Sequence, residues 1–262
     1  MIEFDTTNST IEDLYKHRSI RAYKTAPLSK ELITQVVTAG QRASTSSNLQ
    51  QYSVVIITDQ AKRDKLAELC GGQKHISQAP VFMAWCADVS RLRRAAARVN
   101  APNEIGYVEN FLVSAVDAAL AMQNAAVAAE SLGLGMCYIG GIRNNSQAVI
   151  DLLQLPEGVF PVSGMTLGWP DANPIHRPRL DVNAIMFWDT YGTDNEEALL
   201  EAYDDKMIET GIYDGRQIPA DPNNPNAKPQ RYGWQSHSLR RVSAPKRVEM
   251  SDVLKKQGFK LK

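Results

Sequence analysis

The chain has 262 residues, with 29 Lys and Arg against 29 Asp and Glu, so its formal net charge is zero. With 44% hydrophobic and 22% charged residues, its composition is that of a globular protein with a substantial core rather than a disordered or collagen-like chain. The balanced charge removes the usual electrostatic argument for a nucleic-acid partner, because a duplex binder carries a clear basic excess. A local basic cluster could still bind a small anion.

Cysteine usage and the N-terminal residues indicate a compartment. Cys70, Cys86 and Cys137 are far apart, form no CxxC pair and cannot all pair, because their number is odd. We expect buried free thiols in a reducing compartment. The N-terminal stretch carries Glu3 and Asp5 and has no apolar run of the signal-peptide kind. A cytoplasmic protein is therefore predicted.

Helical and strand patterns alternate as far as Leu167. In chain order we expect helix Ser9–His17, helix Ser29–Ala43, strand Ser53–Thr58, helix Ala61–Cys70, strand Val81–Ala87, helix Tyr107–Leu134, strand Met136–Ile139, helix Ser146–Leu153 and strand Val162–Leu167. The strands are almost continuously apolar, which is typical of a sheet covered on both faces. This alternation predicts an α+β or α/β layer design.

The longest helical pattern, Tyr107–Leu134, is rich in alanine and ends at Gly133, a typical helix stop. Its length is that of a membrane span, but polar residues interrupt it: Glu109, Asn110, Asp117, Gln123, Asn124 and Glu130. We therefore expect the central helix of a soluble domain, with no membrane partner. Its small side chains would let another backbone or a second subunit approach closely.

The last quarter of the chain has a different composition. From Gly211 to Gly233 it is dense in Gly, Pro, Asn and Asp, which predicts a long mobile loop that is either a functional lid or disordered. The tail that follows is basic, with a short helix expected at Ser251–Gln257, and a solvated tail is its simplest interpretation. With this loop and tail, residues 1–262 are expected to form one domain.

The signatures of common nucleotide, hydrolase and zinc sites are missing. The sequence has no GxGxxG after a strand, no GxxxxGK[ST], no HExxH and no GxSxG. Its histidines, His17, His75, His176 and His237, do not have the spacing of metal ligands, so no metal is expected. Catalysis would have to come from a cofactor.

Several short segments instead have the composition of a site for a phosphate and a flat ring. His17 to Arg21 concentrates two guanidinium groups, a hydroxyl and an imidazole, although cations at a helix end can also simply cap the helix. Ala43 to Gln50 offers hydroxyls and amides, although such runs are also common in ordinary turns. Gly71 to His75 adds a flexible backbone with one amide side chain.

Two further segments lie at or after the ends of predicted strands. Tyr138 to Gly141 ends in paired glycines, where a flat ligand can approach the backbone without meeting a side chain. Pro174 to Arg179 holds Arg177 and Arg179 in a loop stiffened by proline. Each segment alone is a weak signal, but their order and content together are specific.

In that order the segments resemble the nitroreductase superfamily, and within it the NADPH-dependent branch of oxygen-insensitive nitroreductases and NADPH–flavin oxidoreductases. HRSIR, STSSNLQ, GGQKHI, AAESLGLG with YIGGIRNN, and LGWPDANPIHRPRL carry the resemblance, which continues more loosely to Trp234 and His237. It implies an α+β fold with a mixed central sheet flanked by helices. It also implies a domain-entwined homodimer with one FMN in each of two interface sites.

The resemblance also implies roles for single residues. The implied FMN-binding positions are His17, Arg18, Ser19, Arg21, Ser46, Ser47, Gln73, Tyr138, Ile139, Gly140, Gly141, Arg177 and Arg179. Arg21 would lie near the electron-accepting pyrimidine edge, Gln73 would hydrogen-bond the flavin edge, and Gly140-Gly141 would lie near N5. Ser46 and Ser47 would come from the second subunit. The two arginines of the Pro-rich loop would clamp the phosphate, where Lys is familiar at the first position.

The implied activity is that of an FMN-dependent NAD(P)H oxidoreductase, which passes two electrons by a ping-pong mechanism to nitroaromatics, quinones or related acceptors. A dedicated NAD(P)H:flavin reductase and a low-turnover FMN carrier stay open as alternatives. No catalytic side chain is expected, because flavin N5 would carry the chemistry. The donor would be NADPH, with NADH possible, and the 2′-phosphate candidates are Arg143, Arg216, Lys228 and Arg231. Helix N-capping is an alternative role for the asparagines beside Arg143.

Overall fold

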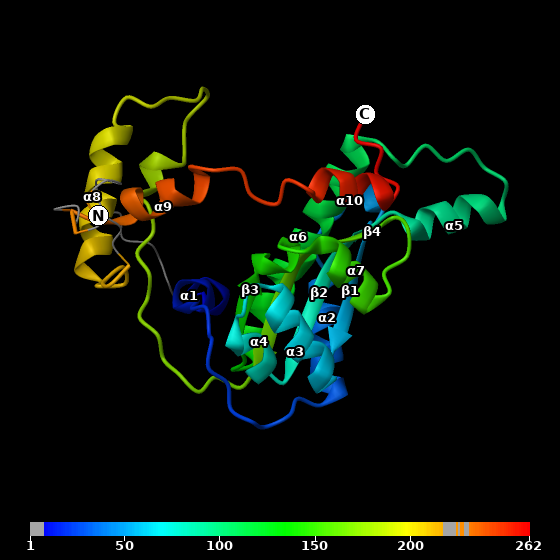
Figure 1. The fold of residues 1–262 in the computed structure, drawn as a ribbon, viewed down its shortest axis with the longest axis horizontal. Helices are drawn as coiled ribbons and strands as arrows, with labels where there is room; N and C mark the ends of the chain where they lie inside the picture. Colours follow the sequence, from blue (N-terminus) through cyan, green and yellow to red (C-terminus); the bar gives the residue numbers. More distant parts are fainter. Residues whose placement is uncertain (1–7, 217–223, 225, 228–230) are drawn as a thin grey trace. The chain divides into compact units, whose positions relative to one another are not determined.

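The structure, a computed structural model, describes residues 8–216, 224, 226–227 and 231–262 (Figure 1). Contacts divide the chain into two compact units. Unit 1 comprises Met1–Pro174 with Arg247–Lys262, and unit 2 comprises Ile175–Lys246. The single domain expected over 1–262 stays a prediction, because two compact units can belong to one folding domain.

Unit 1 is built on a sheet of four strands, β1 (Tyr52–Ile57), β2 (Val81–Asp88), β3 (Gly135–Ile139) and β4 (Val159–Gly168), in the order β1-β2-β4-β3. Every neighbouring pair is antiparallel. The predicted mixed sheet is thus corrected: its named strands are antiparallel, and a parallel bridge joins Ser19 to Met136 beside β3. The reason is that the chain re-enters the sheet at the end where it left, both between β1 and β2 and between β3 and β4.

Helices flank this sheet. They are α1 (Ser9–Lys16), α2 (Lys30–Gly40), α3 (Gln60–Leu69), α4 (Lys74–Gln78), α5 (Ser90–Arg98), α6 (Val108–Ser131), α7 (Ser146–Leu153) and α10 (Met250–Lys256), with 3-10 turns η1 (Ser46–Asn48) and η2 (Gly140–Arg143). All the predicted strands and helices are present, with small shifts at their ends. The one-turn helix α4 and the arginine-rich helix α5 were not predicted.

Strand β2 separates two hydrophobic clusters. Its residues are all buried: Phe82, Ala84 and Cys86 pack in one cluster, and Val81, Met83 and Trp85 pack in the other. The prediction that both sheet faces are covered is therefore confirmed. The cysteines form no disulfide and are buried, and burial raises the pKa of Cys70 and of Cys86 to about 12, so both stay neutral thiols.

The long helix α6 packs on α2 and β2 and contributes Ala118, Ala121 and Ala125 to the second cluster. Gly40 of α2 approaches so closely that a Cβ there would lie 2.8 Å from the carbonyl oxygen of Ala121. The alanines thus allow the close backbone approach that the sequence suggested. By length and composition alone α6 also meets the criterion for a membrane-spanning helix; here it serves as the core helix of unit 1.

The C-terminal residues belong to the core of unit 1. Val253, Leu254 and Phe259 are buried, and the ring of Phe259 meets Phe111 edge-on at 5.3 Å between centroids. The solvated tail expected here is therefore wrong for these residues. The reason is that α10 and the turn after it carry apolar side chains between their lysines, and these fill the first cluster.

Unit 2 contains two helices that the sequence analysis did not predict, α8 (Glu196–Glu209) and α9 (Trp234–Val242), and the 3-10 turn η3 (Val182–Ala184). Tyr203 and Trp234 join the helices by an edge-on ring contact at 5.4 Å. Gln235 N also donates to the buried Asp204 Oδ1 at 2.8 Å. Much of the predicted mobile loop, Gly211 to Gly233, lies outside the described residues.

Candidate functional site

The segment after α1 runs beside the edge strand β3. Ile20 N donates to the carbonyl oxygen of Met136 at 2.8 Å, and Tyr23 Oη donates to the carbonyl oxygen of Ile20 at 2.7 Å. A Cβ at Gly135 would lie 2.7 Å from Ile20 Cγ1, so this strand position has room only for glycine. These contacts fix the backbone on both sides of Arg21, whose side chain is exposed.

His17 is held by the central helix. Its Nδ1 lies 2.7 Å from Glu130 Oε1 of α6. Beside this pair, Tyr138 Oη of β3 donates to Gln123 Oε1 at 2.7 Å, and burial followed by the charge of Glu130 raises the pKa of Tyr138. His17 and Tyr138, both named from the sequence, therefore share one neighbourhood on α6. The helix-cap alternative explains only the backbone of His17, whose N–H donates to Leu14.

Gln73 and Gly141 meet although they are far apart in the sequence. Gln73 Nε2 donates to the carbonyl oxygen of Cys70 at 2.8 Å. A Cβ at Gly141 would lie 2.5 Å from that oxygen and 2.6 Å from Gln73 Nε2. The glycine after β3 thus lets the main chain approach the amide side chain to a distance that no other residue allows.

The charge of Arg21 affects the protonation of His75. Burial, and then the charge of Arg21, lowers the pKa of His75 below its ordinary value of 6.5, so the imidazole is neutral at neutral pH. His75 Nε2 is buried and has no hydrogen-bond partner in the described part of the chain. A neutral ring nitrogen and a cation together suit a ligand that carries polar atoms on a ring.

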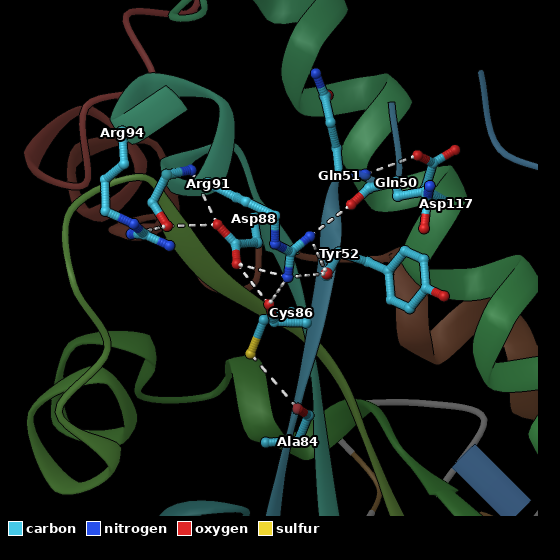
Figure 2. A network of polar contacts seen from close by, with 11 residues as sticks. Gln50, Gln51, Tyr52, Ala84, Cys86, Asp88, Arg91, Arg94 and Asp117 are labelled. Atoms are coloured by element: carbon cyan, nitrogen blue, oxygen red, sulfur yellow. Dashed lines mark hydrogen bonds and ion pairs between the residues drawn. The ribbon is translucent and has the colours of Figure 1, made fainter. Parts of the chain in front are cut away.

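Ser46 and Ser47 lie in η1, whose backbone is unusual. Ser47, Asn48 and Gln50 have φ values of 47°, 57° and 51°, in the left-handed region that residues other than glycine rarely adopt. Asp117 of α6 accepts hydrogen bonds from Ser46 N and Gln51 N, both at 3.1 Å. Figure 2 shows the bond from Gln51. Sequence analysis missed this role of Asp117, because nothing in the local pattern links the residue to the serine turn, residues 45–51.

Arg143 is engaged with the main chain. Its guanidinium is half-buried and donates to the carbonyl oxygen of Val162, and burial, then the charge of Arg247, lowers its pKa. Arg247 donates to Asn144 Oδ1 at 2.9 Å. Asn145 Oδ1 accepts from Ala148 N at 3.2 Å and so caps α7, the alternative role considered for these asparagines. Arg247 was not among the predicted site residues.

Arg177 and Arg179 of unit 2 are exposed and lie near Tyr203. Arg179 donates to the carbonyl oxygen of Arg177 at 2.9 Å, and Tyr203 Oη donates to that of Pro178 at 3.2 Å. Burial raises the pKa of Tyr203, and the charges of Arg179 and Arg177 oppose this. The structure thus brings both predicted phosphate ligands to one tyrosine.

The residues of unit 2 that are candidates for binding the 2′-phosphate of NADPH differ in their partners. Arg231 forms an ion pair with Asp205, with 2.6 Å between Nη2 and Oδ1. Arg216 lies close to His237: the pKa of His237 is lowered by burial, then by the charge of Arg240 and then by that of Arg216. Arg240 donates to the carbonyl oxygen of Arg216 at 3.0 Å. Lys228 lies outside the described residues. Sequence analysis missed the basic pair Arg240-Arg241 because it assigned them to a solvated tail.

Among the described residues, no group of three or more His, Cys, Asp or Glu side chains could hold a metal ion. What the fold gathers is an α+β framework with cations, an amide, a neutral imidazole and close-approaching glycines. Groups of these kinds are suited to a flat, anionic organic ligand.

Family models identify the protein further. Residues 14–169 match the nitroreductase family, and residues 177–262 match the nitroreductase family, C-terminal domain. The chain belongs to the nitroreductase family.

Individual relatives match this chain over almost its whole length. The chain is 38% identical over 250 residues to an oxygen-insensitive NADPH nitroreductase of Salmonella typhimurium, covering 95% of this chain and 98% of the relative. It is 39% identical over 259 residues to an FMN reductase [NAD(P)H] of Bacillus subtilis, covering 97% and 99%. The solved structure of B. megaterium NfrA2 superimposes with a TM-score of 0.88 at 36% identity, covering 98% of this chain and 100% of that one.

Proposed function

We propose that the protein is an FMN-dependent NAD(P)H oxidoreductase that passes two electrons to nitroaromatics, quinones or related small acceptors. Family membership and relatives named NADPH nitroreductase and FMN reductase support this. The observation that carries the proposal is the environment at the end of β3, where Gly141 meets Gln73 while Arg21 acts on a neutral His75.

The residues present fit an FMN. Gly141 leaves the space that a Cβ would fill, and His75 Nε2 is a buried polar atom without a partner among the described residues. The positions that would hold the ring and its polar edges are His17, Arg18, Ser19, Arg21, Gln73 and the backbone of Tyr138, Ile139, Gly140 and Gly141. Ser46 and Ser47 of a second subunit would complete the site, and Arg177 and Arg179 would bind the phosphate as a charge-assisted pair.

When bound, FMN supplies hydride acceptance and donation at its N5. The protein's part is binding and electrostatics. Arg21 would favour negative charge at the edge of a bound ring, because a cation already in place needs little reorganisation when charge develops. Gln73 orients the ring edge through its amide. Since one stacking site would serve donor and acceptor in turn, ping-pong kinetics are expected.

The homodimer is part of the proposal. Val108, Leu112, Val116 and Leu120 are spaced by four residues on α6, and all are about half exposed. Leu14 and Tyr15 of α1, which packs on α6, are exposed as well. An apolar face of this kind on a charge-balanced protein fits a second copy of the chain. A partner at α6 would bring its own serine turn close, because Asp117 links α6 to that turn.

The proposal includes a cytoplasmic location and small-molecule partners, without nucleic acid or membrane. It is tested by comparing turnover of NADPH with a nitroaromatic, a quinone and free FMN as acceptors. Turnover with the nitroaromatic or quinone at rates similar to or above that with free FMN supports the broad oxidoreductase. Turnover with free FMN alone would favour the dedicated flavin reductase, and no turnover by flavin-loaded protein would favour the FMN carrier.

A further inference from the structure

The serine turn, residues 45–51, is held in an unfavourable backbone conformation. Ser47, Asn48 and Gln50 all have positive φ within four residues, and none of them is glycine. Within the turn, Leu49 N donates to the carbonyl oxygen of Ser46 at 2.8 Å, which does little to offset the steric cost of three left-handed residues. Such a turn persists only when its surroundings fix it, and backbone of this kind gathers at ligand sites.

A buried carboxylate bonds to both ends of the turn. Asp117 is 1% exposed, and its two oxygens accept the backbone N–H groups at the two ends of the turn, Ser46 N and Gln51 N, each at 3.1 Å. One carboxylate thus fixes the separation of the ends of the turn. The hydrogen bonds are charge-assisted, and the low exposure of Asp117 makes the loss of either one costly.

A second anchor comes from the start of α5 (Figure 2). Arg91 donates to the carbonyl oxygen of Gln50 at 2.8 Å and also bonds that of Tyr52. Asp88 Oδ2 lies 3.8 Å from Arg91 Nη2, and the carboxylate accepts hydrogen bonds from Ser53 Oγ and Ser90 Oγ. Burial alone would raise the pKa of Asp88, but these hydrogen bonds and the charge of Arg91 lower it, so the carboxylate stays ionised beside the arginine.

We propose that Asp117 and Arg91 are positioning residues for the flavin site: through the main chain at both ends of the serine turn, they hold Ser46 and Ser47 in the conformation that meets the cofactor. The inference rests on the proposed function, since it takes FMN as the ligand that these serines meet. Neither residue touches the cofactor in this account. Both act through the turn, at a cost in backbone strain that their hydrogen bonds offset.

The first test replaces the anchors one at a time. Asp117→Asn keeps one acceptor oxygen and turns a donor toward the other N–H. The rate of FMN dissociation from the holoprotein should therefore increase about tenfold. Arg91→Ala should increase it by about threefold, because one of its two carbonyl contacts lies within the turn. FMN release is followed by the recovery of free-flavin fluorescence on dilution. Ser114→Ala, a buried polar change one turn away on α6, and Arg98→Ala, on α5, are the controls and should stay within twofold of wild type.

The second test separates positioning from general damage to the fold. If Asp117 acts through the serines, Asp117→Asn should increase the rate of FMN dissociation less than threefold when Ser46 and Ser47 are already replaced by alanine. Gln50→Gly should rescue much of the affinity lost in Asp117→Asn, because glycine adopts positive φ without the steric cost that the anchor offsets. A purely structural loss would not respond to a glycine at this one position.

Unchanged FMN release in Asp117→Asn, or an equal loss with and without the serines, would overturn the inference. Hydrogen exchange provides a readout that does not require FMN: the amides of Ser46 and Gln51 should exchange at least tenfold faster in Asp117→Asn than in Ser114→Ala. If the wild-type protein bound no FMN, the proposed function would fail, whereas the exchange result would still report on the anchor.

Discussion

Gly141 lies where a side chain has no room, because a Cβ there would be 2.5 Å from the carbonyl oxygen of Cys70. Paired glycines after a strand could be recognised from the sequence as a place where a flat ligand comes close. Their second role, making room for Gln73 and Cys70, depends on a loop from a distant part of the chain and leaves no local signal. At the scale of single residues, the chemical role of a residue can therefore be predicted from the sequence more readily than its tertiary contacts.

The first prediction concerns this glycine. Gly141→Ala should lower the free energy of unfolding by about 1–3 kcal/mol, because the added methyl meets a main-chain oxygen that cannot move aside easily. It should also reduce the flavin retained after purification, measured as the ratio of flavin to protein absorbance. Gly192→Ala is the matched control, since a Cβ at that position meets nothing within 4 Å. Equal stability of the two variants in urea would contradict the account.

A second prediction concerns pH. Burial and Arg21 lower the pKa of His75 below 6.5, so the folded protein takes up less proton than the unfolded chain below that pH. Its contribution to stability is complete above about pH 6.5 and is lost as the pH falls through that value toward the folded pKa.

In His75→Gln the free energy of unfolding should therefore decrease less steeply between about pH 6.5 and 5 than in wild type. The pKa of His237 is also lowered, by burial and then by Arg240, so His237→Gln should remove a separate share of the slope. Urea titrations at closely spaced pH values measure both slopes. A wild-type slope in His75→Gln would show that the imidazole is not desolvated.

At the scale of elements, α6 was predicted within a few residues because its composition and its glycine stop are local signals. Helices α5, α8 and α9 were missed although their Arg, Ala, Glu and Leu residues favour helix. The anchoring of the serine turn by Asp117 could not be predicted, since the tertiary contact joins residues that the sequence places in unrelated segments. The same holds for Phe259, whose burial depends on α10 returning to unit 1.

The apolar face of α6 leads to a third prediction. Val116→Glu should convert a dimer to monomers, because it places a charge in the middle of a face that a second copy would bury. Analytical ultracentrifugation measures the change. Val99→Glu is the control, since Val99 is also exposed, at 74%, but lies outside that face. A dimer that tolerates Val116→Glu, or a wild-type protein that is monomeric, would contradict the assignment of this face.

At the scale of the whole molecule, the resemblance read from five segments predicted the family, and the family models confirm it over both units. The order of the strands and their antiparallel pairing were beyond local patterns. The structure also sorts the candidates for the NADPH phosphate, which the sequence could only list. Arg143 is engaged with Val162 and Arg231 is paired with Asp205, whereas Arg216 lies in a basic cluster near Arg240.

A fourth prediction follows from this sorting. Arg216→Ala should raise the KM for NADPH about tenfold with little change for NADH, because a phosphate that loses one charge-assisted contact binds more weakly. Arg231→Ala should change both cofactors to the same small extent, since its guanidinium already has a carboxylate partner. Steady-state kinetics with each nucleotide provide the comparison. Equal effects of Arg216→Ala on NADPH and NADH would exclude this residue as the phosphate ligand.

The measurement that tests the central claim most directly is an anaerobic titration of the purified, FMN-loaded protein with NADPH and, separately, with NADH, followed at the flavin absorbance band. The account predicts that the band bleaches stoichiometrically, faster with NADPH, and returns when a nitroaromatic or quinone is added. A bound flavin that neither nucleotide bleaches would contradict the oxidoreductase assignment. Protein that binds no flavin even after reconstitution would contradict the site itself.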